Sequence, residues 1–188
     1  MVNSGLNLTW LDGDNPPLMG ECESLELGEI IRRYAQGTTL LERRLLDLDD
    51  EQADAYFRPE AGVGRWSCRA LVGHLADAEL VQVHRMRRTV AEDQPVFALW
   101  DENAFLDAGL YTGAERPLAG FVATIHTLRV WTGEWLESLP ESAWQRISLH
   151  PESGEQSLRS LLNKTTWHFE HHVWYLRRKL SRILGPPE

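Results

Sequence analysis

The sequence has few cysteines and no long uncharged apolar run. Its two cysteines, Cys22 and Cys68, are distant from each other and form no CxxC pair. This scarcity argues against a disulfide framework and against a zinc site built from thiolates, and it fits a reducing compartment. The first residues lack the basic and apolar regions of a signal peptide, and no stretch is long enough to cross a bilayer. We therefore expect a cytoplasmic protein without a membrane partner.

Positive charge is also in short supply. Lys and Arg together number 19, against 28 Asp and Glu, which gives a formal net charge of −9. A surface that binds phosphates needs a concentrated positive field, so nucleic acid is not an expected partner. The two local basic clusters, at 84–88 and 177–182, fall in the C-terminal parts of predicted helices, where cations complement the helix dipole.

Apolar residues recur at helical spacing in four segments. The chain has 188 residues, of which 43% are hydrophobic, so it is long enough for one core and short for two domains. The spacing predicts helices over residues 24–48, 67–91, 118–139 and 157–184. We expect an all-α four-helix bundle over residues 23–188, preceded by an irregular N-terminal arm at residues 1–22.

The connections between these helices differ in length. Residues 49–65 form a connector much longer than the tight turn that joins neighbouring antiparallel helices, so they have the reach to carry the chain across the bundle. Residues 93–117 form a second long connection, mostly loop, with a turn of helix expected around Glu102 to Leu106. A polar segment of turns precedes the last helix, and no strand with clear alternation is evident. Long loops often carry binding groups.

Three histidines interrupt the apolar faces of two predicted helices. His168 and His172 are four residues apart, so their side chains lie one above the other on one helix face. His74 lies on the inward face of the second helix. Three imidazoles buried side by side are costly unless a cation organises them, and Zn²⁺ or Ni²⁺ accepts nitrogen ligands at about 2.0–2.1 Å. The pattern predicts a divalent metal ion on His74, His168 and His172, with a position left for water or substrate.

Several alternatives stay open on the sequence. His171 lies three residues after His168 and replaces one of its neighbours if the helix is rotated. If the second and fourth helices do not dock as assumed, the imidazoles form no more than a hydrogen-bonded polar core. Asp77, one turn after His74, is the carboxylate best placed to act as a general base or to orient His74; otherwise it is a solvated helix carboxylate. The zinc-protease motifs HExxH and HxxEH do not occur here.

The sequence resembles the DinB/YfiT-like metalloenzymes. The resemblance covers about residues 24–184 and is carried, in this order, by Trp66-Ser67, Gly73-His74-Leu75-Ala76-Asp77-Ala78-Glu79 and His168-Phe169-Glu170-His171-His172. It implies a four-helix bundle with a long crossover between helices 1 and 2, a nickel or zinc ion on His74, His168 and His172, and a homodimer. Many members carry a glutamine or a basic residue after the last histidine, where this chain has Val173, so the substrate stays open.

The resemblance also implies a choice of chemistry. Characterised members include thiol S-transferases that use bacillithiol or mycothiol, together with a mycothiol-dependent maleylpyruvate isomerase. Our leading hypothesis is a metal-dependent enzyme in which the ion lowers the pKa of a coordinated small-molecule thiol, for transfer to an electrophile, or of water, for hydrolysis. The alternative is a noncatalytic, metal-stabilised homodimer with a stress-associated role.

Overall fold

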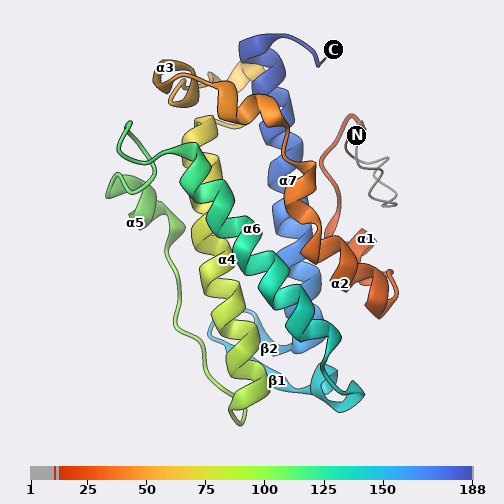
Figure 1. The fold of residues 1–188 in the computed structure, drawn as a ribbon. Helices are drawn as coiled ribbons and strands as arrows, with labels where there is room; N and C mark the ends of the chain where they lie inside the picture. Colours follow the sequence, from red (N-terminus) through yellow and green to blue (C-terminus); the bar gives the residue numbers. More distant parts are fainter. Residues whose placement is uncertain (1–10, 12, 188) are drawn as a thin grey trace.

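Four long helices form the body of the molecule. The computed structural model describes residue 11 and residues 13–187. The bundle helices are α2 (Leu27–Ala35), α4 (Cys68–Ala91), α6 (Leu118–Glu137) and α7 (Leu158–Leu184). Helix α4 packs against α6 and α7, and α2 packs against the same two helices (Figure 1). This arrangement confirms the predicted all-α four-helix bundle, and no helix among the described residues is long and apolar enough to span a membrane.

The two helices that carry the histidines begin and end at residues that favour helix ends. The side chain of Ser67 caps α4 by accepting a hydrogen bond from the backbone N–H of Ala70 (3.1 Å). Ser157 caps α7 in the same way, through the N–H of Ser160 (3.1 Å). Helix α7 ends at Leu184. The next residue is Gly185, whose φ of +84° suits glycine, and two prolines follow it. The boundaries of both helices agree with the prediction.

The first bundle helix is shorter than predicted. The spacing over 24–48 predicts one continuous helix, but α2 ends at Ala35. The carbonyl oxygen of Tyr34 accepts a hydrogen bond from Nη1 of Arg129 (2.9 Å), in place of a backbone N–H one turn later. Gly37 permits this approach, because a Cβ there would collide with the Arg129 guanidinium. The chain then continues as two 3₁₀ turns, Gly37–Leu40 and Arg43–Asp47, which keep the apolar spacing of a helix.

A crossover joins α2 to α4, as the length of the connector predicts. It contains the one-turn helix α3 (Asp50–Ala53) and a 3₁₀ turn at Pro59–Ala61. Arg69 at the start of α4 holds it in place, because its guanidinium donates hydrogen bonds to Asp50 (2.5 Å) and Asp54 (2.9 Å). The crossover therefore reaches the N-terminal end of α4 on a fixed path.

The loop between α4 and α6 is tied to a small sheet that the sequence analysis missed. The predicted turn of helix is present as α5 (Glu102–Asp107). The polar segment expected to form only turns contains a 3₁₀ turn, Glu141–Gln145, and an antiparallel hairpin of β1 (Ile147–His150) and β2 (Gly154–Ser157). The N–H of Phe97 donates to the carbonyl of Leu149 (2.9 Å), so the loop pairs with β1. This pairing fixes the loop that passes over the histidines.

The predicted arm at residues 1–22 is described only in part. Residues 1–10 and 12 lie outside the described residues, and the last part of the arm is helical, as α1 (Met19–Glu23). Helix α1 packs against α7, and the indole N–H of Trp174 donates to the carbonyl of Gly13 (3.0 Å). The division between arm and bundle domain stays a prediction.

A layer of buried charge divides the core. One apolar cluster surrounds the N-terminal half of α4 and the C-terminal half of α7, and a second surrounds the opposite halves. Between them Nε of Arg129 donates to Glu79 (2.7 Å), and Nε of Arg33 donates to Glu170 (2.6 Å). These four side chains are buried. The histidines lie at about this level of the bundle.

Candidate metal centre

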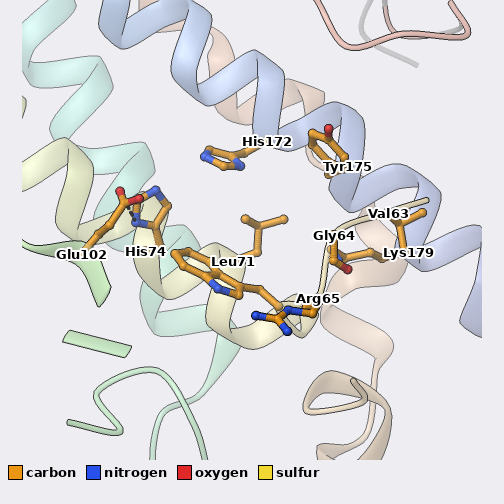
Figure 2. A pocket seen from close by; sticks show the side chains of 10 residues that line it. Val63, Gly64, Arg65, Leu71, His74, Glu102, His172, Tyr175 and Lys179 are labelled. Carbon is orange, nitrogen blue, oxygen red and sulfur yellow. Dashed lines mark hydrogen bonds and ion pairs between the residues drawn. The ribbon is translucent and has the colours of Figure 1, made fainter. Parts of the chain in front are cut away.

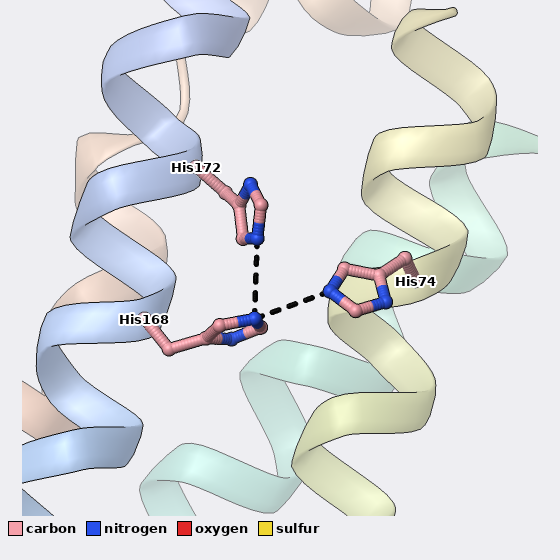
Figure 3. Close-up of side chains that lie close together, drawn as sticks. All are labelled: His74, His168 and His172. Atoms are coloured by element: carbon pink, nitrogen blue, oxygen red, sulfur yellow. Dashed lines mark hydrogen bonds between the residues drawn. The ribbon is translucent and has the colours of Figure 1, made fainter. Parts of the chain in front are cut away.

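The structure brings together the three histidines named from the sequence. His74 lies on α4, and His168 and His172 lie one turn apart on α7; we refer to them as the histidine trio (Figure 3). The Nε2 atom of His168 lies 3.2 Å from Nε2 of His74 and 3.1 Å from Nε2 of His172. His74 is buried, and the other two are half-buried. The docking of α4 on α7, which the sequence analysis had to assume, is therefore present.

The spacing of the trio fits one divalent metal ion. A ligand atom from each ring lies within 4.8 Å of the other two. Two nitrogens that bind one ion tetrahedrally at about 2.05 Å are about 3.3 Å apart, close to the two Nε2 separations here. Nε2 of His168 carries either one proton or one lone pair, so it cannot form two full hydrogen bonds to the other two ring nitrogens at once. The donor set is thus that of a three-histidine site with open coordination positions, although its use as a metal site stays a prediction.

Burial keeps these imidazoles neutral. It lowers the pKa of His74 from 6.5 to about 4, because the charged ring would lose its solvation. Burial and the neighbouring His74 lower the pKa of His172 to about 3, and the same kinds of cause lower the pKa of His168 well below its usual value. A neutral imidazole offers a free lone pair, which a metal ion requires.

Aromatic rings and one carboxylate surround His74. Its ring stacks on Trp100, with centroids 5.4 Å apart and planes 8° apart, and meets the edge of Trp66 at 5.1 Å. Its Nδ1 makes no hydrogen bond within the described chain, and Oε2 of Glu102 lies 3.8 Å away. A ligating histidine commonly donates its second N–H to a carboxylate, which fixes its tautomer. Glu102 is therefore in position to orient His74.

Two cavities reach the trio. The first, of about 250 Å³, is lined by His74 and His172 and extends along α7 to Lys179; we call it the Lys179 cavity (Figure 2). The second, of about 240 Å³, is lined by His168 together with Lys164, and we call it the Lys164 cavity. Glu102 lines both cavities. An ion held by all three rings would therefore lie beside lining residues of both cavities.

The structure separates His171 from the trio. Its ring packs between Trp167 (centroids 5.1 Å apart) and Tyr175 (5.2 Å), away from the shared nitrogen atoms. The alternative in which His171 replaces a neighbour therefore has no support in the geometry. The sequence argument for His172, that it continues the apolar face of its helix, agrees with the placement of the ring.

The structure describes two carboxylates in this region, Asp77 and Glu102. Asp77 is half-buried and lies near Tyr111, whose pKa is raised by burial and by the Asp77 carboxylate. Its role as a general base stays a prediction. Glu102 was not considered, because it lies 28 positions from His74 in a loop whose path the sequence does not fix. The sequence feature that could have pointed to Glu102 was the expected turn of helix at this residue, within a long loop.

Comparison with protein families identifies the same group that the motifs resemble. The family model described as the DinB superfamily matches residues 33–176. A solved structure, YfiT from Bacillus subtilis, has the same fold, with a TM-score of 0.75, 24% sequence identity, and coverage of 97% of this chain and 100% of that one. It is described as having an unusual four-helix bundle topology.

The curated relatives share one name. A protein of Oceanobacillus iheyensis is 27% identical over 163 residues, which are 87% of this chain and 91% of the relative. A protein of Bacillus licheniformis is 27% identical over 164 residues, 87% of this chain and 90% of the relative. Both carry the name "Putative metal-dependent hydrolase". The relatives and the trio together support a divalent metal ion.

Proposed function

Because the chain belongs to the DinB superfamily and brings three histidine nitrogens to one point, we propose that it is a metal-dependent enzyme that activates a small-molecule thiol. The histidine trio would hold the ion. When bound, a divalent cation lowers the pKa of a thiol or water that coordinates it, so that a nucleophile is present at neutral pH. Nickel and zinc are the ions we propose, since both accept imidazole nitrogen.

The surrounding residues have definable tasks in such a reaction. Trp66 and Trp100 cover the His74 ring and keep water from its faces. Glu102, 3.8 Å from Nδ1 of His74, would favour the tautomer with the proton on Nδ1, which leaves Nε2 as the ligating atom. Asp77 is kept as a proposed general base, acting with Tyr111.

The observation that carries the proposal is that rings of the trio line two separate cavities. Transfer to an electrophile needs two reactants side by side, and each cavity has room for one small molecule beside a different ring of the trio. Hydrolysis is the second candidate, and the shared name of the curated relatives favours it. In that reaction water replaces the thiol as the nucleophile.

The metal site is tested by elemental analysis of protein purified without a histidine tag. We expect about one nickel or zinc ion per chain, and loss of the ion in the variant His172→Ala. The matched control is His126→Ala, because His126 is exposed and bonds Thr38 (3.0 Å) away from the trio. Equal metal content in both variants would contradict the site.

The reaction is tested with a panel of thiols and esters. Metal-loaded protein should conjugate electrophiles with bacillithiol, mycothiol or glutathione, and both chelation and His172→Ala should abolish turnover. Ester hydrolysis without thiol consumption would select the second candidate. If neither reaction occurs and removal of metal only lowers the melting temperature, the ion serves to lock α4 to α7. Light scattering of the same samples tests the proposed homodimer.

A further inference from the structure

Lys179 is a buried cation without a buried counter-charge. Its side chain is 1% exposed, and its Nζ donates one hydrogen bond, to the carbonyl of Gly64 (2.9 Å). The ammonium also lies 4.5 Å from the ring centroid of Phe57. Within the described chain no carboxylate forms an ion pair with it, and burial lowers its pKa to about 8. Since an ammonium has three donors, this group retains capacity for a further acceptor.

The cost of this arrangement suggests a missing partner. A buried charge is expensive unless it is paired, and a carbonyl and an aromatic ring compensate only part of the lost hydration. Lys179 is one of the residues that line the cavity beside the trio. A ligand that carries a negative charge would supply the counter-charge that the protein does not.

The position of Lys179 sets the shape of that ligand. His172 and Lys179 lie seven residues apart on α7, which is two turns and a rise of about 10 Å on one face. Helix side chains lean towards the N-terminus, so the Lys179 stem leans towards His172. Figure 2 shows Lys179 beside Gly64 at one end of the cavity, the rings of His74 and His172 at the other, and Leu71 between them. The ends are polar, and the middle is apolar.

Lysine is rare in this chain. The chain has only two lysines, Lys164 and Lys179, among 19 cationic residues, and each lines one of the two cavities at the trio. Arginines also line these cavities, Arg65 in the first and Arg85 in the second, whereas Arg33 and Arg129 form the buried ion pairs of the bundle. A compact ammonium on a flexible stem suits a group that must pair with an incoming anion.

We propose that Lys179 is the anion-binding group of the substrate cavity, and that the ligand is a small molecule with a carboxylate at one end, an apolar middle, and its reacting group at the trio. The second half of this statement rests on the proposed metal-dependent function. Arg65 also lines this cavity, but it is exposed, so Lys179 is the buried cation among the lining residues. A carboxylate fits better than a phosphate, because one buried ammonium balances one charge, whereas a phosphate carries nearly two.

Calorimetric titration of the metal-loaded full chain tests the proposal. The probes are mercaptohexanoate and mercaptohexanol, which differ only in the charged end. Wild-type protein should bind the carboxylate about tenfold or more tightly, the usual size of a hydrogen bond to a charged group. Lys179→Met should remove this preference and leave the affinity for the alcohol unchanged. Lys164→Met, the same substitution in the other cavity, should keep the preference.

Several outcomes would overturn the proposal. It is wrong if the wild-type protein binds the two probes equally, a result that needs no variant and so does not depend on how well Lys179→Met folds. It is also wrong if the folded Lys179→Met variant keeps the preference, or if it weakens both probes equally, since that would make Lys179 a structural residue.

A further probe separates this proposal from the metal-dependent function. Hexanoate has no thiol, so its binding should depend on Lys179 and persist in the metal-site variant His74→Ala. If hexanoate binds in this way while elemental analysis finds no metal, only the proposed enzyme function fails. If metal and mercaptohexanol bind but neither carboxylate gains from Lys179, only the anion site fails.

Discussion

At the scale of single residues, the imidazole of His74 has a neighbouring side chain at each of its two nitrogens. Nε2 faces His168 at 3.2 Å, and Nδ1 faces Glu102 at 3.8 Å, while the rings of Trp66 and Trp100 limit rotation. A ligand held in this way needs little reorganisation when an ion binds. Glu102 is therefore expected to affect metal affinity, although it lies far from His74 in the sequence.

The role of Glu102 is open to direct measurement. We expect Glu102→Gln to weaken metal binding by about 10- to 100-fold, because an amide orients the Nδ1 proton less well than a carboxylate does. Asp77→Asn is the matched comparison, since Asp77 is the carboxylate closer in sequence but lies beside Tyr111. Metal affinities from competition with a chromophoric chelator decide between them. A larger loss in Asp77→Asn would return the orienting role to Asp77.

Acid should destabilise the metal-free protein through the trio. In the unfolded chain a histidine titrates near pH 6.5, whereas burial lowers the pKa of His74 to about 4 in the folded chain. Between these values the unfolded chain binds a proton that the folded chain excludes, so the free energy of unfolding decreases as pH falls. The contribution of His74 to stability is fully present well above pH 6.5, and lowering the pH from 6.5 to 5 should remove about 1.5 kcal/mol of it.

Urea denaturation of chelator-treated protein at the two pH values measures this loss. His74→Gln should show a smaller difference between them, because glutamine does not titrate. His84→Gln, at an exposed position, should keep the wild-type difference. The same pH dependence in both variants would show that other groups control the acid response.

The site residues that could be predicted from the sequence are those whose helix face follows from helical periodicity. His168 and His172 share a helix face by spacing alone, and His74 follows a capped helix start, so three residues on two helices could be named. Glu102 and Lys179 could not be assigned in this way. The first depends on the path of a loop, and the second stands in an apolar stripe where only the structure reveals a cavity beside it.

At the scale of elements, the loop over the trio depends on a glycine in α4. Gly73 precedes His74, and a Cβ on it would lie 2.6 Å from Cδ1 of Tyr111. Tyr111 is 1% exposed and anchors the loop that also carries Trp100 and Glu102. The glycine weakens the helix locally, yet it allows the loop to lie close to the histidine.

Replacement of this glycine separates helix propensity from packing. Gly73→Ala gains up to about 1 kcal/mol of helix propensity but forces the Tyr111 ring outwards, at about 1–3 kcal/mol, so we expect a lower melting temperature. Gly120→Ala in α6 is the control, because its Cβ would meet Pro117 at an ordinary 3.8 Å, and we expect a higher melting temperature. Thermal denaturation followed by circular dichroism measures both. A rise in both variants would refute the packing argument.

The elements that were mispredicted share a physical cause. The spacing over 24–48 is helical, but Arg129 takes the Tyr34 carbonyl and Gly37 makes room for it, so a tertiary contact ends α2. The hairpin of β1 and β2 is stabilised by pairing with the loop at Phe97. Both features depend on residues far away in the sequence, which local periodicity does not encode. The capped helices α4 and α7 depend on local signals and were predicted.

At the scale of the whole molecule, one guanidinium joins all four helices. Arg129 on α6 donates to the carbonyl of Tyr34 on α2, to Glu79 on α4 and to the carbonyl of Thr165 on α7 (3.4 Å). It also stacks on the ring of Phe169, with the guanidinium carbon 3.9 Å from the ring centroid. Because Phe169 is adjacent to His168, the same contact that closes the bundle also fixes the helix that carries two members of the trio.

Removal of this guanidinium should therefore destabilise the fold strongly. Arg129→Met leaves Glu79 buried and unpaired, and we expect a loss of about 3–5 kcal/mol in the free energy of unfolding. Burial raises the pKa of Glu79 and Arg129 opposes that rise, so the pKa of this carboxyl should rise further without Arg129. The double variant Glu79→Gln with Arg129→Met should recover part of the lost free energy of unfolding, because it removes the carboxylate that Arg129→Met leaves without its partner. Glu92→Gln, which breaks the exposed pair with Arg88, should have a much smaller effect, because solvent screens that pair. Urea denaturation of the four proteins gives the comparison, and a loss in Arg129→Met no larger than in Glu92→Gln would mean that the bundle closes without this contact.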